Sequence, residues 1–272
     1  MRHAILVFFF IVSIIGLSLY FNSLRHSGEL KTNPESLDVS SVDEKKTNTT
    51  PDHVITFNQN RYAVYLQKIN PANLTLIPNF DEKKTSRELI QENNCKAAVN
   101  GGFYTQDNKP LGLFITNGKQ IQPINEESTL LTGFFYKTID DSLFIATTTF
   151  ARGPLFNGVT TSSLSFALQS GPLFTPQTTL KIKDDEYARR ILVGQDENND
   201  FYFIAITEIE NIHSGPLLGD VPQIITAVNR QLQTANYELL LNLDGGSASA
   251  FIDEKERNLS ELVSVGSFLC AK

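Results

Sequence analysis

Tryptophan is absent from this sequence of 272 residues, and histidine, cysteine and methionine are scarce, with four, two and one residues. The two isolated cysteines and the scattered histidines lack the spacing of zinc ligands. The net charge is −7, and no stripe of basic residues with interleaved aromatics follows the N-terminal region. These absences argue against a zinc site and against nucleic acid as a partner. The lack of tryptophan leaves a sugar ligand undecided, because 19 phenylalanines and 8 tyrosines remain for stacking.

A serine-hydrolase elbow is missing too, since the chain contains no Gly-x-Ser-x-Gly motif. The two cysteines, Cys95 and Cys270, leave two alternatives open. In an exported protein they would pair, whereas buried free thiols would serve equally well as small apolar side chains. Their spacing in the sequence does not decide between these alternatives.

One long apolar run, residues 4–21, follows Arg2 and His3 and contains no charged residue. Its length of about 18 residues reaches that of a membrane span and exceeds that of a usual signal-peptide core. Because no small-x-small cleavage site follows it, residues 1–22 are predicted to form an uncleaved signal anchor. The C-terminal domain would then lie outside the cytoplasm at the cell membrane. A cleaved signal peptide, giving a secreted protein, is the alternative.

The composition changes after the apolar run. Residues 23–53 are rich in Ser, Thr, Asn, Lys, Asp and Glu and poor in apolar residues, which predicts a disordered linker. Residues 54–272, about 220 in number, are enough for one hydrophobic core and fit a single domain. No internal repeat is evident.

Short alternating or apolar segments dominate this domain and predict strands. Residues 111–124 predict a hairpin with Asn117-Gly118 as its type I′ turn. Residues 80–94 predict a short helix that begins near Thr85 or Ser86.

A second helix is indicated at residues 217–235, where apolar side chains recur every three or four positions and Asp220 stands as the N-cap. This helix joins the strand predicted at 201–206 to the strand at 239–241. A right-handed parallel crossover is therefore expected over residues 201–244. The predicted fold class is α+β, a single domain with a β-rich mixed sheet and a few helices.

The central motif is the stretch 239–251, in which an apolar run ends in Asp244, Gly245 and Gly246. Three successive leucines predict a strand buried on both faces. The glycines lack a Cβ, so the backbone can turn sharply and a ligand can approach closely. Taken alone, the stretch also fits a plain turn in which Asp244 bonds only its own backbone.

Other strand ends carry similar polar chemistry. Residues 97–104 place Asn100 and two glycines directly after an apolar run, and Arg190 enters another apolar strand. In chain order, Asn-Gly-Gly-Phe-Tyr, Ser-Gly-Pro-Leu, Arg-x-x-x-Gly and Leu-Asp-Gly-Gly resemble the phosphodiester glycosidase family over residues 62–272. The resemblance implies a similar β-rich fold and a hydrolase that acts on glycosyl phosphodiesters.

If these strand ends converge, they bring together the Asn100 amide, the Arg190 guanidinium and the Asp244 carboxylate. This set suits an anionic sugar phosphate, because Arg190 can hold phosphate with a bidentate fork and Gly-Gly N–H groups can form an anion-binding nest. Arg189 is expected to be the solvated neighbour of Arg190. A surface ion pair is the alternative role for Arg190.

Asp244 is the predicted base or nucleophile. A phosphodiester departs as a stabilised phosphomonoester, so Arg190 can partly replace a general acid. Glu208 is the weaker candidate for a second catalytic carboxylate, and His213 is a candidate acid. Coordination of structural Ca²⁺ is an alternative for Asp244, and no other cofactor is expected. The predicted substrate-binding residues are Asn100, Gly101, Gly102, Ser170, Gly171, Gly245, Gly246 and Ser249.

Together these patterns predict an exported or membrane-anchored hydrolase that cleaves a sugar-1-phosphodiester or a related cell-envelope glycan. Its partners would be this glycan and, through the N-terminal segment, the membrane. A non-catalytic envelope glycan-binding protein that uses the same cleft is the competing hypothesis.

Overall fold

A computed structural model of the protein describes residues 50–148, 163–232 and 236–272. These residues all belong to one compact unit, residues 46–272. The predicted signal anchor and most of the predicted linker lie outside the described residues, so both stay predictions. Within the described ranges, no helix combines the length and the apolar character needed to cross a membrane.

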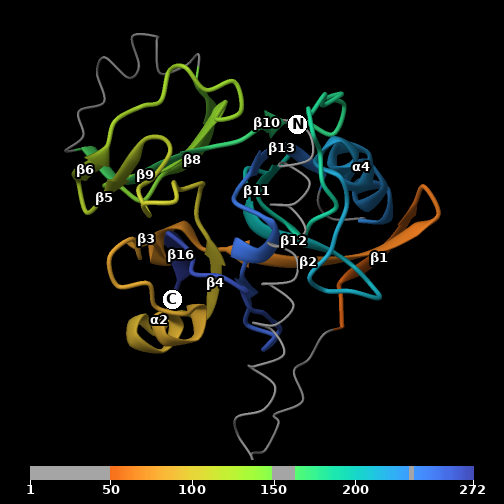
Figure 1. Ribbon diagram of the computed structural model, residues 1–272, viewed down its shortest axis with the longest axis horizontal. Helices are drawn as coiled ribbons and strands as arrows, with labels where there is room; N and C mark the ends of the chain where they lie inside the picture. Colours follow the sequence, from red (N-terminus) through yellow and green to blue (C-terminus); the bar gives the residue numbers. More distant parts are fainter. Residues whose placement is uncertain (1–49, 149–162, 233–235) are drawn as a thin grey trace, which may run out of the picture. The chain divides into compact units, whose positions relative to one another are not determined.

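Three sheets form the framework of the described chain (Figure 1). The first has the strand order β1 (His53–Phe57), β2 (Asn60–Ile69), β12 (Phe201–Glu208), β11 (Arg190–Asp196), β13 (Tyr237–Asn242), β10 (Leu173–Phe174). The second has the order β15 (Asn258–Leu259), β14 (Phe251–Ile252), β4 (Ala97–Asn100), β16 (Ser267–Ala271), β3 (Leu74–Pro78). The third has the order β6 (Lys119–Gln122), β5 (Phe114–Thr116), β9 (Leu164–Ser170), β7 (Gly133–Thr138), β8 (Leu143–Thr147). The fold is therefore β-rich, as predicted.

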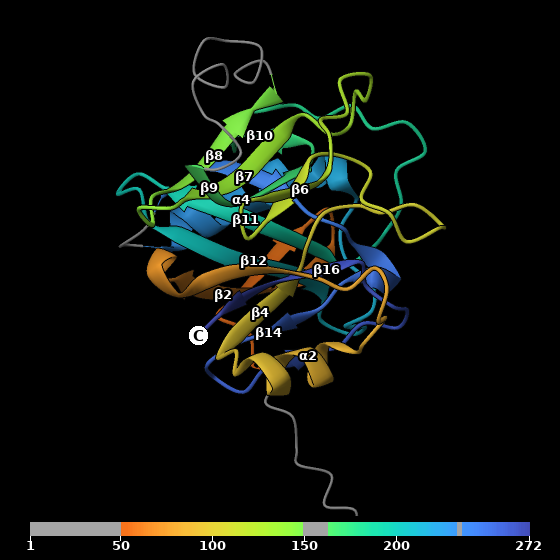
Figure 2. The same cartoon turned by 90° about the vertical axis from the view of Figure 1, so that its left-hand side faces the viewer.

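Two α-helices cover sheet faces in the described residues. Helix α4 (Val221–Gln231) packs its apolar stripe against one face of the six-stranded sheet, where Ile224 meets residues such as Leu192. The opposite face, with Val193 among its residues, belongs to a core shared with the other two sheets. Helix α2 (Ser86–Asn93) lies along β4 and β16 (Figure 2). Burial of apolar surface on both faces of the six-stranded sheet is thus the main stabilising contribution.

Local sequence signals explain several of these elements. Helix α2 begins with a capping box, in which Thr85 accepts from the Glu88 N–H and the Glu88 carboxylate accepts from the Thr85 N–H. The β5–β6 hairpin turns at Asn117 and Gly118, whose φ values of 50° and 70° fit the predicted type I′ turn. Short 3₁₀ turns occur at η1 (Pro71–Asn73), η3 (Leu218–Asp220) and η4 (Gly246–Ala248).

The strand predicted at 239–241 is confirmed as part of β13. Leu240 packs toward α4 and Leu241 packs into the shared core, so β13 is buried on both faces. Cys95 and Cys270 form a disulfide with a Cα–Cα distance of 5.5 Å, which selects the paired alternative. The bridge ties the start of β4 to its neighbour β16.

Two expectations differ from the structure. Every strand pairing among the described residues is antiparallel. Strands β12 and β13 do run in the same direction across α4, but β11 lies between them, so the expected parallel pair does not form. Asp220 stands at the N-cap position of α4 without a side-chain capping bond, because its own backbone is already helical, with φ −90° and ψ −16°.

Candidate active site

The ends of β4 and β13 are joined by one buried amide. Asn100 donates from Nδ2 to the Asp244 carbonyl (2.8 Å), and its Oδ1 accepts from the Ala250 N–H (2.9 Å). The Asp244 N–H in turn donates to the Gly101 carbonyl (3.2 Å). Asn100 is fully buried, so the predicted substrate contact is wrong for its side chain. Its amide is used to hold the Asp244 backbone in place.

Asp244 itself follows β13 and stays partly exposed. Its Oδ1 accepts from the Gly245 N–H (2.8 Å), so the local bond of the turn hypothesis is present. Burial raises the pKa of the Asp244 carboxyl to about 7, and the Gly245 bond offsets only part of this increase. A carboxyl that titrates near neutrality can accept or release a proton at physiological pH. The turn and a catalytic role are therefore compatible.

Arg190 lies beside the same turn. A Cβ built on Gly245 would lie 4.0 Å from Arg190 Nη1. Arg190 Nε donates to the Pro216 carbonyl (2.9 Å), and Nη2 donates to the Asp185 carboxylate (3.2 Å) and to the Glu186 carbonyl. The predicted bidentate fork toward phosphate is therefore wrong, because two of the three guanidinium nitrogens bind the protein. Nη1, which faces the turn, has no hydrogen bond to another described residue and is left for a ligand.

The prediction that Arg189 is solvated is wrong, because its side chain is fully buried. Its Nε donates to Ser249 Oγ (2.6 Å), and Nη2 donates to the Ser249 and Ser260 carbonyls. Burial lowers the pKa of the guanidinium to about 10, which still leaves it charged at neutral pH. Ser249 also donates from Oγ to the Gly246 carbonyl and is fully buried. The predicted sugar contact of Ser249 is thus wrong, since its hydroxyl braces the loop after Asp244.

Ser170 is likewise used inside the protein. Its hydroxyl donates to the Asn242 carbonyl (2.7 Å), and the Asn242 amide donates to the Gly171 carbonyl (2.9 Å). A Cβ on Gly171 would lie 2.1 Å from the Leu130 carbonyl oxygen, so this glycine permits a close backbone contact. Ser170 is fully buried, which excludes the predicted substrate contact of its side chain.

The Gly-Gly pairs also serve packing more than anion binding. The N–H groups of Gly101, Gly245 and Gly246 donate to Ser267 O, Asp244 Oδ1 and Arg189 O. The predicted nest is therefore wrong for these three donors. Gly102 allows a close backbone contact, because a Cβ at this position would lie only 3.0 Å from the Gln169 carbonyl oxygen.

Glu208 ends β12, and β11 separates that strand from β13. Its charge contributes to a raised pKa of Tyr62, whose main cause is burial. The strand register pairs Arg190 with Ile206 in β12 and Leu192 with Asn242 in β13, so Glu208 and Asp244 lie at the same end of the sheet with β11 between them. His213 is exposed in the following loop. The catalytic roles of Glu208 and His213 stay predictions.

Sequence reasoning missed two residues near this turn. Burial, and then the charge of Asp244, raise the pKa of the Tyr104 phenol, whose hydroxyl donates to the Ser264 carbonyl. The adjacent Asn-Gly-Gly was the available signal for Tyr104. Asp185 pairs with Arg190, and both side chains are mostly buried, at 14% and 11% exposure. Nothing in the acidic run around Asp185 indicated this pairing.

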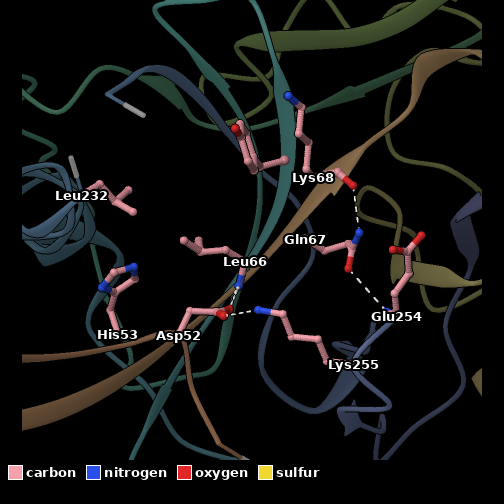
Figure 3. A pocket seen from close by; sticks show the side chains of 9 residues that line it. Asp52, His53, Leu66, Gln67, Lys68, Leu232, Glu254 and Lys255 are labelled. Atoms are coloured by element: carbon pink, nitrogen blue, oxygen red, sulfur yellow. Dashed lines mark hydrogen bonds and ion pairs between the residues drawn. The ribbon is translucent and has the colours of Figure 1, made fainter. Parts of the chain in front are cut away.

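A separate hollow of about 610 Å³ lies where β12 begins, at the opposite end of that strand from Glu208 (Figure 3). Its two lysines are paired with carboxylates, Lys68 with Asp200 and Lys255 with Asp52. None of the predicted site residues lines this hollow.

In the part of the chain that the structure describes, no group of three or more His, Cys, Asp or Glu side chains is placed to hold a metal ion. Ca²⁺ coordination by Asp244 stays an untested alternative.

Comparison with solved structures shows a shared fold at low sequence identity. The auto-inhibited catalytic domain of zebrafish N-acetylglucosamine-1-phosphodiester alpha-N-acetylglucosaminidase superposes with a TM-score of 0.58 and 13% identity, covering 80% of each chain. A hypothetical protein from Synechocystis superposes with a TM-score of 0.52 and 15% identity, and the match covers 80% of this chain and 60% of that protein. A putative exported protein from Burkholderia pseudomallei superposes with a TM-score of 0.50 and 10% identity, and the match covers 78% of this chain and 74% of that protein.

Comparison at the sequence level gives the family. Among curated proteins no match was found. The profile of the family described as phosphodiester glycosidase matches residues 93–265, which is more than half of the chain and includes Asn100, Arg190 and Asp244. On this match, the chain belongs to the phosphodiester glycosidase family.

Proposed function

We propose that this protein is a hydrolase that cleaves the bond between an anomeric carbon and a phosphodiester oxygen in a cell-envelope glycan. The observation that carries the proposal is a partly exposed carboxyl at Asp244, with a pKa raised to about 7, beside the mostly buried guanidinium of Arg190. Family membership supports the reaction class. The name of the zebrafish enzyme of similar fold specifies an N-acetylglucosamine-1-phosphodiester, which makes an amino sugar a reasonable first substrate to test.

The chemistry assigns different tasks to the two side chains. Asp244, in its ionised form, either removes a proton from the attacking water or attacks the anomeric carbon itself. Arg190 Nη1 stabilises the negative charge that develops on the departing phosphate oxygen. Because a phosphomonoester is a stable leaving group, the reaction does not require a strong general acid.

The buried polar residues around the turn give the site its rigidity. Asn100 fixes the Asp244 carbonyl, and Arg189 fixes the loop through Ser249. Side chains held by complete hydrogen-bond sets lose little entropy when a substrate binds. We infer that these residues position Asp244 and Arg190 without touching the substrate.

A reporter glycosyl phosphodiester with a chromogenic alcohol on the phosphate, coupled to a phosphatase, tests the proposal. Wild-type protein should release sugar and phosphomonoester, and Asp244→Asn should lower kcat by at least 100-fold while KM changes little. Asp81→Asn, at an exposed position, is the matched control and should retain most activity. Binding of the reporter without turnover by wild-type protein would instead support the glycan-binding alternative.

The location is also part of the proposal. We propose that residues 1–22 anchor the enzyme in the cell membrane, with residues 54–272 outside the cytoplasm, or alternatively direct its secretion. An apolar run of about 18 residues supports membrane insertion. The disulfide between Cys95 and Cys270 is of the kind that persists in oxidising compartments outside the cytosol.

A further inference from the structure

The charge of Arg190 is already compensated inside the protein. Asp185 Oδ1 lies 3.2 Å from Arg190 Nη2, and both side chains are largely shielded from solvent. The backbone carbonyl of Glu186 accepts from the same nitrogen. An ion pair in such surroundings is screened much less than one on the surface. An anion that approaches Arg190 Nη1 therefore meets a cation whose field is weakened by its carboxylate partner.

More negative charge lies nearby. Asp244 directly precedes Gly245 in the same turn, and its carboxyl is mainly ionised above pH 7. Asp220 lies close to Asp185, whose charge adds to burial in raising the pKa of the Asp220 carboxyl. One guanidinium is thus surrounded by carboxylates, so the region attracts a monoanion weakly and disfavours a dianion.

We propose that Asp185 makes this site selective for singly charged phosphodiesters over doubly charged phosphomonoesters. The inference rests on the proposed function and adds to it a specificity determinant and a route for product release. Cleavage of a glycosyl phosphodiester converts a monoanionic substrate group into a phosphomonoester whose second pKa is about 6. Above that pH the product carries two charges and is repelled, which prevents the product from occupying the site.

The size of the effect follows from charge counting. Coulomb energy scales with the product of the charges, so neutralising Asp185 acts twice as strongly on the free energy of a dianion as on that of a monoanion. If the affinity for a monoanion rises about threefold, the affinity for a dianion rises by the square of that factor, roughly tenfold. The ratio of the two affinities is the measurable quantity.

A purely structural role for Asp185 has to be separated from this. The carboxylate also accepts from the Leu218 N–H (2.9 Å) and the Gly219 N–H (2.8 Å), which tie it to the turn before α4. In Asp185→Asn the remaining Oδ1 can keep the bond to the Leu218 N–H while the charge and the bond to the Gly219 N–H are lost. Asp185→Glu keeps the charge with altered geometry. Asp81→Asn removes an exposed charge that makes no contact with Arg190 and serves as the matched control.

The experiment measures binding of methyl phosphate and dimethyl phosphate to the full-length chain at pH 8, by NMR titration of the Arg190 guanidinium signals. In Asp185→Asn, methyl phosphate should bind about tenfold more tightly and dimethyl phosphate about threefold more tightly than in wild type. Asp81→Asn and Asp185→Glu should leave the ratio of affinities within about twofold of the wild-type ratio. Thermal melting confirms that each variant is folded.

The possible results separate the two proposals. An unchanged ratio in folded Asp185→Asn, or an equal change in Asp81→Asn, overturns the role of Asp185 and leaves the proposed hydrolysis intact. Wild-type protein that binds dimethyl phosphate better than methyl phosphate but hydrolyses no glycosyl phosphodiester overturns the proposed function alone. Wild-type protein that binds neither probe overturns both.

Discussion

The raised pKa of Asp244 has a measurable consequence for stability. In the unfolded chain an aspartate titrates near pH 3.9, whereas burial raises the pKa of Asp244 in the folded protein to about 7. Between these values the folded state binds one proton more than the unfolded state. The free energy of unfolding should therefore decrease as the pH rises from about 4 to about 7. Asp244→Asn removes this titration and should be more stable than wild type at neutral and alkaline pH.

The magnitude follows from the shift. A difference of about 3 pKa units at about 1.4 kcal/mol per unit gives an upper bound of about 4 kcal/mol for the cost of ionising Asp244 in the folded protein. Because the residue keeps some contact with solvent, we expect about 2–4 kcal/mol at pH 8. The variant keeps an Oδ1 acceptor for the Gly245 N–H, so the turn itself should survive. A gain in stability with a loss of activity is the usual relationship for a strained catalytic group.

Urea denaturation followed by far-UV circular dichroism measures this effect, since the chain has no tryptophan for fluorescence. Wild type and Asp244→Asn should have similar midpoints at pH 4 and diverge progressively up to pH 8. Asp81→Asn, at an exposed position, is the control for the loss of one negative charge. If the two curves run parallel from pH 4 to pH 8, or if Asp244→Asn is the less stable protein at pH 8, the assigned pKa and its cause are wrong.

Three further predictions can be checked with standard assays. Arg190→Lys should weaken phosphate binding and also lower the melting temperature, because lysine cannot keep the bonds to Pro216 and Asp185 together; an unchanged melting temperature would contradict these contacts. Replacing Cys95 and Cys270 by serine should lower the free energy of unfolding by about 5 kcal/mol, the chain-entropy value for a separation of 175 residues. Mass spectrometry of the unreduced wild-type protein should show the linked peptides. Deleting residues 1–26 should move the protein from the membrane fraction to the soluble fraction as a folded domain; an intact chain in the cytosol would refute the anchor.

Local patterns in the sequence were sufficient for much of the fold. The capping box at Thr85, the Asn117-Gly118 hairpin and the doubly buried strand around Leu240 each depend on interactions within a few residues. Strand order depends on pairing between distant segments, which periodicity does not encode. The position of β11 between β12 and β13 is an example, because the strand that separates them precedes both in the sequence. A strand, helix, strand pattern alone could not show it.

The candidate site stays a prediction, and the contacts of its polar residues could not be predicted from the sequence. Asn100, Ser170 and Ser249 are polar residues at strand ends, which is where ligand-binding groups are often found. In this protein all three donate to backbone carbonyls, Asn100 to that of Asp244, Ser170 to that of Asn242 and Ser249 to that of Gly246. A buried carbonyl or N–H that lacks a partner costs about 1–3 kcal/mol, so irregular segments packed inside a domain require such side chains. From sequence alone, a residue that satisfies the backbone and one that binds a ligand look the same.

Arg189 and Arg190 show why neighbouring residues of one type can exchange roles. Successive side chains of an extended segment point to opposite faces, so one of the two had to face the protein interior. The prediction placed Arg189 in solvent, but its side chain is fully buried. The cost of burying a guanidinium is met for Arg189 because its nitrogens reach Ser249 and Ser260, whereas Arg190 keeps Nη1 toward the Asp-Gly-Gly turn. The side of the extended segment on which each arginine lies therefore determines which one holds the loop and which one is available to a phosphate.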